Sequence, residues 1–332
     1  MTELSVEQKV YQMFILGYEG ENPRAVPEFR KALNSGLGGV IFFTHNICEK
    51  ERFKQAVKII KEESAILPPF LSIDQEGGRV ERTLNLYGGH HYKSARDVAK
   101  QGENVVLQQA QWISEELKYL GINMNFAPVL DVDTNPDNPV IADRSYSSNC
   151  NDVIKYGKIT AKTYLKNGII PVGKHFPGHG DTSVDSHKDL PEVALNIKEL
   201  EDIHIKPFKE LLEYLPAIMV AHVHYKAFNN EKIPASVSNE VIEKYLRGKL
   251  NYQGVVISDD MVMGGIRHFS PFEACKKGIE SGVNMFIYRN ADDSVIQLIE
   301  DIISAVKRKE IDINKINRSV ECIKRLKNVA KL

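Results

Sequence analysis

The most informative segment of this chain is Lys174-His-Phe-Pro-Gly-His-Gly-Asp-Thr-Ser-Val-Asp-Ser-His187. It follows a short apolar run, residues 169–172, that is typical of a buried strand, and it continues as a loop punctuated by glycine and proline. The loop is rich in histidine and aspartate. Because barrel enzymes carry their reactive groups on the loops that follow the strands, we expect the functional site here.

Seven other apolar runs have the length and composition of strands. With residues 169–176 they form this set: 13–17, 39–43, 70–74, 122–132, 218–222, 255–260 and 285–288. Amphipathic helical patterns lie between them, at 52–64, 104–120, 153–166, 197–214, 239–250 and 272–281. Glycine follows several of these helices, as expected of a helix C-cap: Gly121, Gly168 and Gly282. This alternation predicts a parallel sheet covered by helices.

Polar side chains follow several of the predicted strands, and their distribution separates two fold classes. They are Asp74, Asp131, Lys174 with His175, His222 with His224, and Asp259 with Asp260. In an open sheet, only strands near the switch point share a site, whereas all eight strand ends of a barrel converge. No linker-like segment interrupts the chain. We therefore predict an α/β fold, with residues 1–332 forming a single (β/α)8 TIM-type barrel domain.

Composition excludes several classes of protein. The chain has 332 residues with a net charge of -1, which gives no electrostatic reason to expect nucleic acid or an anionic membrane as partner. The four cysteines are scattered, which indicates reduced thiols. The N-terminus lacks the pattern of a signal peptide, and no apolar run approaches the ~18 residues of a membrane span. We expect a cytoplasmic protein, monomeric by default.

Two motifs supply candidate binding groups. Residues 74–82, Asp-Gln-Glu-Gly-Gly-Arg-Val-Glu-Arg, place Asp74 at a strand end and Arg82 after a glycine turn. A structural ion-pair cluster is the alternative reading of these charges. Residues 135–146 contain two prolines and several turn formers, which predicts a stiff loop. Arg144 in that loop has a planar fork of donors that suits hydroxyls or a carboxylate.

Two further motifs supply candidate reactive groups. Alternation directs Lys174 and His175 to opposite faces, so both reach one ligand only if the strand bends, which the following Pro177-Gly178 permits. Asp185 is two residues from His187, where a carboxylate fixes the imidazole tautomer and raises its basicity.

A buried strand also delivers two adjacent carboxylates, Asp259 and Asp260, whose desolvation requires a function or a partner. Alternation directs one of them to the barrel axis without deciding which.

These motifs together resemble one known family. The segments DQEGGRV, DRSYS, KHFPGHGDTSVDSHKDLP, AHVHY, PASVS and GVVISDDMVMGGI are similar to bacterial β-N-acetylglucosaminidases of glycoside hydrolase family 3, and they occur in that family's order. The similarity runs from Gln12 to the C-terminal helix. It implies a retaining enzyme that removes terminal N-acetylglucosamine through a covalent glycosyl-aspartate, without cofactor or metal. With a cytoplasmic location, the implied substrates are GlcNAc-muropeptides from peptidoglycan recycling.

The resemblance also implies residue roles. Asp259 matches the nucleophile, and His187, oriented by Asp185, matches the acid/base. Five residues match those that hold the hydroxyls of the terminal sugar: Asp74, Arg82, Arg144, Lys174 and His175. Larger members take the acid from a second domain, so the loop carrying His187 is expected to supply it here. Its root, with Pro177, Gly178 and Gly180, suggests a loop that closes over substrate.

Several alternatives remain open at this point. An imidazole repels an incoming anion less than a carboxylate does, so phosphate could replace water, and a β-glucosidase-type activity uses the same scaffold. Asp259-Asp260 would also serve a mechanism in which the substrate's acetamide is the nucleophile. A metal-dependent hydrolase and a non-catalytic sugar-binding protein are the remaining readings. The metal reading rests on five histidines with strand-end aspartates: His175, His179, His187, His222 and His224.

Overall fold

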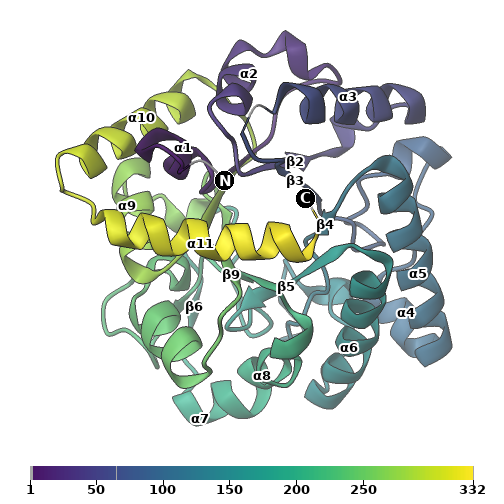
Figure 1. The fold of residues 1–332 in the computed structure, drawn as a ribbon. Helices are drawn as coiled ribbons and strands as arrows, with labels where there is room; N and C mark the ends of the chain where they lie inside the picture. The colour runs from purple at the N-terminus through teal and green to yellow at the C-terminus, as the bar shows by residue number, and fades with distance from the viewer. Residues whose placement is uncertain (1–2, 65, 332) are drawn as a thin grey trace.

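Eight parallel strands close into a barrel in the computed structural model, which describes residues 3–64 and 66–331 (Figure 1). Around the barrel the order is β1-β10-β9-β7-β5-β4-β3-β2. The strands are β1 (Phe14–Leu16), β2 (Gly39–Phe42), β3 (Phe70–Ile73), β4 (Met124–Asn125), β5 (Ile170–Phe176), β7 (Ala217–Val220), β9 (Val255–Asp260) and β10 (Met285–Tyr288). Each lies within or overlaps one of the eight predicted runs, so the predicted (β/α)8 fold is confirmed.

Strand β4 is much shorter than the predicted run of residues 122–132. The backbone still follows β5 beyond it, because Leu130 N donates to Lys174 O at 2.6 Å. Pro128 interrupts the regular ladder because it has no amide hydrogen to donate. The prediction of a continuous strand over 122–132 was therefore wrong in extent, although the segment keeps its place in the barrel wall.

Helices surround the barrel. They are α1 (Val6–Tyr11), α2 (Pro27–Asn34), α3 (Lys50–Glu63), α4 (Ala95–Gln101), α5 (Glu103–Leu120), α6 (Cys150–Asn167), α7 (Ile197–Glu199), α8 (Lys206–Leu211), η8 (Glu240–Lys249), α9 (Pro271–Ser281), α10 (Asp293–Lys307) and α11 (Ile313–Val329). The predicted helix 197–214 is present without a gap, although its hydrogen-bonding pattern changes from α to π over Leu200–Ile205, just before Pro207, which has no amide hydrogen to donate. The predicted C-cap glycines 121, 168 and 282 all adopt left-handed conformations, with φ of 84°, 82° and 96°.

Helix α11 covers the amino-terminal end of the barrel, in front of the strands in Figure 1. Its buried Lys327 Nζ donates to Gln12 Oε1 at 2.7 Å, immediately before β1, and lies over the ring of Phe70 at the start of β3. Burial lowers the pKa of Lys327 to about 7. The opposite end, where the loops after the strands meet, is left for the site.

A small parallel pair of strands lies outside the barrel. Here β6 (Glu192–Val193) pairs with β8 (His224–Tyr225). It ties the far end of the loop that follows β5 to the segment that follows β7. His224 therefore belongs to this pair rather than to a barrel strand end.

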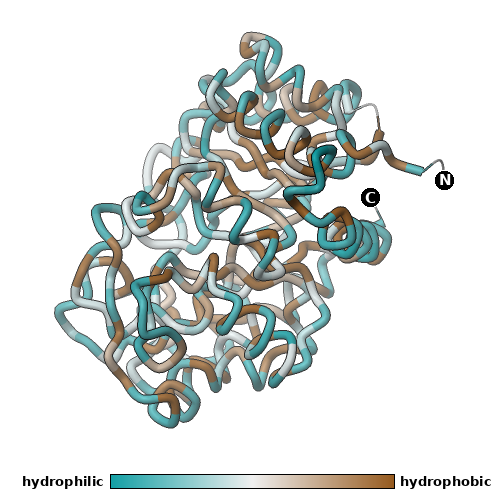
Figure 2. Tube along the Cα trace, turned by 90° about the vertical axis from the view of Figure 1, so that its left-hand side faces the viewer, coloured by the Kyte–Doolittle hydropathy of each residue, from teal (hydrophilic) through white to brown (hydrophobic). Residues whose placement is uncertain are grey.

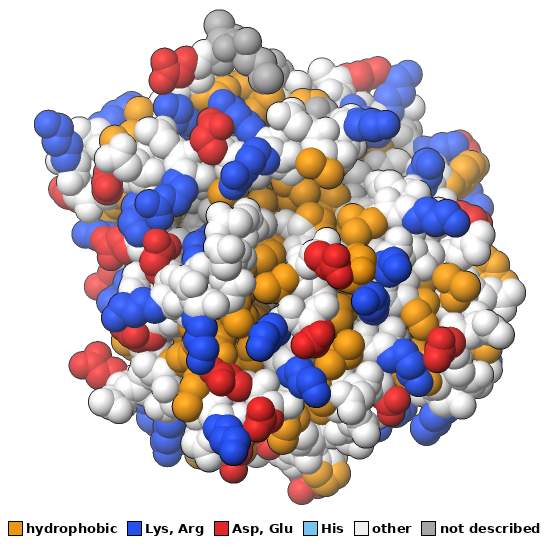
Figure 3. All heavy atoms as spheres, turned by 60° about the horizontal axis from the view of Figure 1, so that its bottom comes forward, with side chains coloured by type: hydrophobic (Ala, Val, Ile, Leu, Met, Phe, Trp, Pro, Cys, Tyr) orange, Lys and Arg blue, Asp and Glu red, His pale blue; other side chains and the backbone are white. Residues whose placement is uncertain are grey.

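The outer surface is mixed in character. Along the outer helices in Figure 2 the tube alternates between hydrophilic and hydrophobic residues, as expected of helices that bury one face. Figure 3 shows Lys and Arg interspersed with Asp and Glu over the face that it displays, in agreement with the net charge of -1. Within residues 3–64 and 66–331, no helix is long and apolar enough to cross a membrane.

Candidate active site

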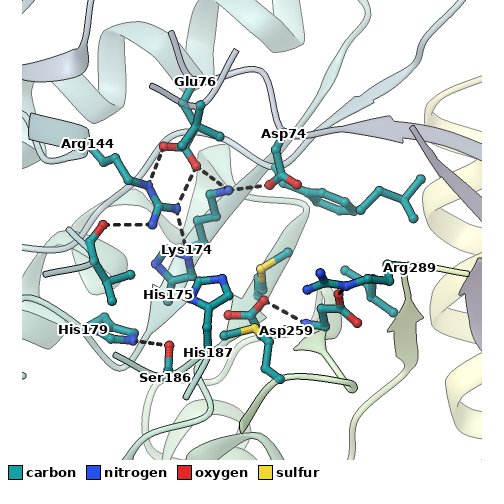
Figure 4. A pocket seen from close by; sticks show the side chains of 18 of the residues that line it. Asp74, Glu76, Arg144, Lys174, His175, His179, Ser186, His187, Asp259 and Arg289 are labelled. Atoms are coloured by element: carbon teal, nitrogen blue, oxygen red, sulfur yellow. Dashed lines mark hydrogen bonds and ion pairs between the residues drawn. The ribbon is translucent and has the colours of Figure 1, made fainter. Parts of the chain in front are cut away.

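A cavity of about 160 Å³ opens at the end of the barrel where the strands terminate (Figure 4). The loops after β3, β4 and β5 and the ends of β9 and β10 contribute to its lining. Seven of the eight predicted site residues line it: Asp74, Arg82, Arg144, Lys174, His175, His187 and Asp259. The eighth, Asp185, lies behind His187 and is hydrogen-bonded to it. The structure thus brings all the predicted site residues together.

One wall of the cavity is a network of buried opposite charges. Lys174 Nζ lies 2.7 Å from Asp74 Oδ1 and 2.6 Å from Glu76 Oε1. Arg144 binds both oxygens of Glu76, each at 2.9 Å. Burial alone would raise the pKa of Glu76, but the charges of Arg144 and Lys174 outweigh it and hold that pKa well below its usual value. Both cations are therefore fixed by Glu76, which the sequence motif contained but which was not predicted as a site residue.

Replacing this shared carboxylate is expected to destabilise the protein strongly. In Glu76→Gln, buried Arg144 loses its charge partner and buried Lys174 loses one of its two, which costs about 3 kcal/mol in the free energy of unfolding. The folded-state pKa of Glu76 is lowered, so its stabilisation is present above the unfolded value of about 4.3 and is lost as pH falls through the folded pKa. Urea unfolding from pH 7 down to 3 measures both effects, and the gap between wild type and variant should narrow at acid pH.

The matched control for this prediction is Glu63→Gln. Glu63 also pairs with two arginines, Arg24 and Arg30, but their side chains are about half exposed. Exposed ion pairs contribute little, so a loss below about 1 kcal/mol is expected. Equal losses for the two variants would show that the buried network adds no special stability.

His175 is oriented by a carboxylate that was noted in the sequence only as a strand-end residue. Its Nδ1 lies 2.6 Å from Asp131 Oδ2, and Asp131 Oδ1 accepts the backbone N–H of His179 at 2.6 Å. Burial would raise the pKa of Asp131, but the neighbouring His175 lowers it overall. The other ring nitrogen, His175 Nε2, is 3.4 Å from Arg144 Nη2 and faces the cavity.

Lys174 and His175 both reach the cavity because the strand is irregular there. The pairing register of β5 with β7 shifts between Gly173 and Phe176. Such an irregularity turns successive side chains toward one face, in place of strict alternation. The bend expected at Pro177-Gly178 therefore begins earlier, between Gly173 and Phe176.

The structure distinguishes the two adjacent carboxylates of β9. Asp260 Oδ2 accepts Arg289 Nε at 2.6 Å, and burial raises the pKa of Asp260 despite that partner. Asp259 accepts only the backbone N–H of Asp260, at 2.8 Å, among the hydrogen bonds of the described residues. Burial would raise the pKa of Asp259, but the nearby His175 and His222 lower it overall. Asp259 is thus the ionised carboxylate that faces the cavity without a side-chain partner.

Arg82 lies at the cavity rim with unused donor capacity. Its Nη2 is 3.8 Å from Asp74 Oδ2, and its guanidinium lies 5.6 Å from the ring centroid of Phe43. Its Nε is buried and has no hydrogen-bond partner among the described residues. A buried donor of this kind calls for a partner from outside the chain, such as a ligand hydroxyl or an ordered water.

The loop after β5 presents His187 at the mouth of the cavity. His187 Nδ1 lies 2.8 Å from Asp185 Oδ1, and its side chain is 55% exposed. Burial would raise the pKa of Asp185, but its hydrogen bonds from His187 lower it overall. The expected pairing of the two residues is therefore present, with Nε2 of the imidazole directed away from the carboxylate.

The same loop is seated on a glycine pair that follows β9. Gly264 N donates to His187 O at 3.1 Å, and Gly265 N donates to Ser186 O at 2.9 Å. A Cβ at Gly264 would lie 2.3 Å from the carbonyl carbon of Lys188. Beneath it, buried His179 Nε2 lies 3.0 Å from Ser186 Oγ. The segment that carries Asp259 thus also supports the loop that carries His187.

The root of this loop is closely packed. Gly178 has a φ of +135°, and a Cβ there would lie 2.6 Å from His204 Cβ. At Gly180 a Cβ would lie 1.8 Å from the carbonyl oxygen of Val132. The glycines expected to serve as a hinge are required here for close backbone approach.

Four of the five histidines that suggested a metal-dependent hydrolase have the following hydrogen-bond partners. His175 binds Asp131, His187 binds Asp185, and His179 lies between Thr182 and Ser186. The Nδ1 atom of His222 lies 2.6 Å from Ser236 Oγ. Across residues 3–64 and 66–331, no group of three or more His, Cys, Asp or Glu side chains is placed to hold a metal ion.

The fold and the cavity together define a class of protein: a (β/α)8 barrel whose open end holds a free carboxylate, an imidazole–carboxylate pair and a set of donors for a polar ligand. The chain belongs to glycosyl hydrolase family 3, because the model of that family's N-terminal domain matches residues 5–326. The family expected from the sequence motifs is thereby confirmed.

Known proteins similar to the chain carry consistent names. It is 34% identical over 323 residues to a beta-hexosaminidase A of Pseudoalteromonas piscicida, covering 88% of this chain, and 31% identical over 270 residues to a beta-hexosaminidase of Tolumonas auensis, covering 80% of this chain and 79% of that protein. A family 3 beta-N-acetylglucosaminidase from Paenibacillus sp. str. FPU-7 superposes with a TM-score of 0.93 at 34% identity over 99% of this chain. The chain spans 53% of the Pseudoalteromonas protein and 63% of the Paenibacillus chain.

Proposed function

We propose that the chain hydrolyses β-linked N-acetylglucosamine from non-reducing ends with retention of configuration. The observation that carries this proposal is Asp259, a partly buried, ionised carboxylate without a side-chain partner among the described residues, in the same cavity as His187. A carboxylate left free beside an imidazole–carboxylate pair suits nucleophilic attack with proton transfer. The names of the relatives support N-acetylglucosamine as the sugar.

The proposed reaction has two steps. In the first, an Asp259 oxygen bonds to the anomeric carbon while the glycosidic C–O bond breaks, and His187 gives its Nε2 proton to the leaving oxygen. In the second, neutral His187 removes a proton from water, which attacks the same carbon and releases Asp259. Asp185 holds the proton on Nδ1 of His187 and stabilises the cation when both nitrogens are protonated.

The remaining cavity residues are proposed to hold the sugar. Hydroxyls are acceptors for cations and donors for carboxylates, and the cavity provides both. The proposed hydroxyl-binding residues are Asp74, Arg82, Arg144, Lys174 and His175. Glu76 and Asp131 act through these residues. The carboxylate of Glu76 is bound by Arg144 and that of Asp131 by His175, so each fixes the position of a cavity side chain.

The wider setting is also a proposal. We infer that the chain forms one catalytic domain, acts as a monomer in the cytoplasm and takes GlcNAc-muropeptides as substrates. The barrel closes within this chain and already contains both proposed reactive groups, which supports a single catalytic unit. The motif resemblance supports the substrate class.

Proton NMR of the hydrolysis of an aryl β-N-acetylglucosaminide tests the proposal. The first sugar product should be the β-anomer, because two inversions at C1 restore the starting configuration. An α-anomer as first product would exclude a covalent intermediate, and the absence of any hydrolysis would exclude the activity.

The glycine seat of the loop gives a separate prediction. In Gly264→Ala the new Cβ meets the Lys188 backbone, so the loop shifts and His187 moves out of position. We expect a roughly tenfold or larger loss of kcat/KM on an alkyl glycoside that needs an acid, and a smaller loss on a 2,4-dinitrophenyl glycoside. Gly248→Ala, on the outer helix η8, is the control and should change neither rate. Equal losses on both substrates for Gly264→Ala would show that the contact between Gly264 and the loop does not act through proton donation by His187.

A further inference from the structure

Arg289 lies where the candidate active site meets a second cavity. It is the one residue that lines both the pocket around Asp259 and a neighbouring cavity of about 650 Å³, within the described part of the chain. The second cavity lies between the segments that follow β9 and β10, and its walls are largely apolar. They include Met261, Val262, Ile266, Phe269, Tyr288 and Leu298. The two cavities are therefore neighbours, with Arg289 in the wall of both.

The position of Arg289 is fixed from two directions. Its backbone packs against Gly17, where a Cβ would lie 2.0 Å from the Arg289 carbonyl oxygen. Its side chain donates through Nε to Asp260 Oδ2 at 2.6 Å, and Asp260 N in turn donates to Asp259 Oδ1. The guanidinium is thus hydrogen-bonded to Asp260, the sequence neighbour of the proposed nucleophile Asp259.

Arg289 keeps donors that this arrangement does not use. Nε is its only side-chain hydrogen-bonding atom with a partner among the described residues, so the two Nη groups remain unused. The side chain of Arg289 is 46% exposed, whereas that of Asp260 is 12% exposed. An incoming group therefore meets the cation of this pair and not the carboxylate.

The surroundings of Arg289 differ from those of the sugar-binding cations. Figure 4 shows Arg144 and His175 on one side of Asp259 and Arg289 on the other. Lys174 and Arg144 are neutralised by buried carboxylates on the first side. On the second side the cavity walls are apolar apart from Arg267, Arg289, Asn290, Asp292 and Ser294, and Asp292 caps the first turn of α10. A neutral, fully hydroxylated group would find few partners there.

We propose that Arg289 is a specificity-determining residue that binds a carboxylate on the leaving group, with the apolar cavity receiving the remainder of that group. This inference rests on the proposed glycosidase function and names the class of aglycone it acts on: acidic, with apolar parts. A guanidinium presents paired N–H donors that match the two oxygens of a carboxylate. Because Arg289 is about half exposed, the preference is moderate and depends on salt.

Two glycosides of equal size test the proposal: 3-carboxyphenyl and 3-carbamoylphenyl β-N-acetylglucosaminide. They differ in the charge of the leaving group, so the ratio of their kcat/KM values measures anion recognition and cancels general losses. We expect wild type to favour the carboxylate about tenfold at low ionic strength, with a smaller ratio in 0.5 M NaCl. Arg289→Gln should bring the ratio to about one, and Arg289→Lys should keep part of it.

Arg267→Gln is the matched control, because Arg267 lines only the second cavity. It should keep the wild-type ratio. A wild-type ratio near one, an unchanged ratio in Arg289→Gln, or a ratio lost only in Arg267→Gln would overturn the role of Arg289 and leave the glycosidase function intact. An equal loss on both glycosides in Arg289→Gln would also overturn it, since Arg289 would then serve the sugar. Failure of wild type to hydrolyse either glycoside would instead overturn the proposed function.

Discussion

Asp259→Asn is expected to lower kcat on aryl β-N-acetylglucosaminides by about 10³-fold or more. The amide has nearly the same shape as the carboxylate but cannot attack C1 or stabilise the developing positive charge, and both effects act only in the transition state. Because Asp259 has no side-chain partner among the described residues, the exchange breaks no side-chain hydrogen bond. Steady-state kinetics with a 4-nitrophenyl glycoside, together with a melting curve, measure the effect.

Asp260→Asn is the matched control for this loss. The two carboxylates are adjacent on β9, but Asp260 is bound to Arg289 and is proposed to position it rather than to react. We expect a loss of about tenfold or less. Reversed results, with Asp260→Asn inactive and Asp259→Asn nearly normal, would show that Asp260 and not Asp259 is the nucleophile.

His187→Ala is expected to give the second largest effect, and that effect should depend on the leaving group. An alkyl leaving group needs a proton, so its hydrolysis should slow by about 10²- to 10⁴-fold. A 2,4-dinitrophenolate leaves without help, so formation of the glycosyl-enzyme should change little. A plot of log kcat/KM against leaving-group pKa should become much steeper in the variant.

His268→Ala provides the control for that series. His268 is an exposed histidine paired with Asp189 of the same loop region, and it does not line the cavity. It should leave the plot unchanged. A slope for His187→Ala equal to that of wild type would mean that another group supplies the proton.

The barrel was predictable from the sequence because its signals are local. Each strand is a short apolar run, and helix ends are marked by glycines such as Gly121 and Gly282, whose left-handed backbone favours residues without a side chain. The error in β4 has a local cause as well, since Pro128 cannot continue the ladder. The π segment of the predicted helix 197–214 likewise lies just before Pro207.

The site was predictable at its motif residues but not in its pairings. Alternation could not choose between Asp259 and Asp260, because the choice depends on Arg289, 29 residues further along the chain. Glu76 meets Arg144 across 68 residues, and the barrel alone brings them together.

Asp131 was visible as a strand-end carboxylate, yet its role appears only when His175 of the next strand lies beside it. Positioning residues of this kind carry no local pattern, because each is defined by a partner on another strand.

Mass spectrometry after reaction with a 5-fluoro-N-acetylglucosaminyl fluoride tests the central claim most directly. The fluorine at C5 slows the breakdown of a glycosyl-enzyme, so the adduct accumulates if it forms. Peptic digestion should place the added sugar on the peptide containing Asp259, with no adduct in Asp259→Asn. Steady turnover of this compound without any adduct, or an adduct on another residue, would contradict the account.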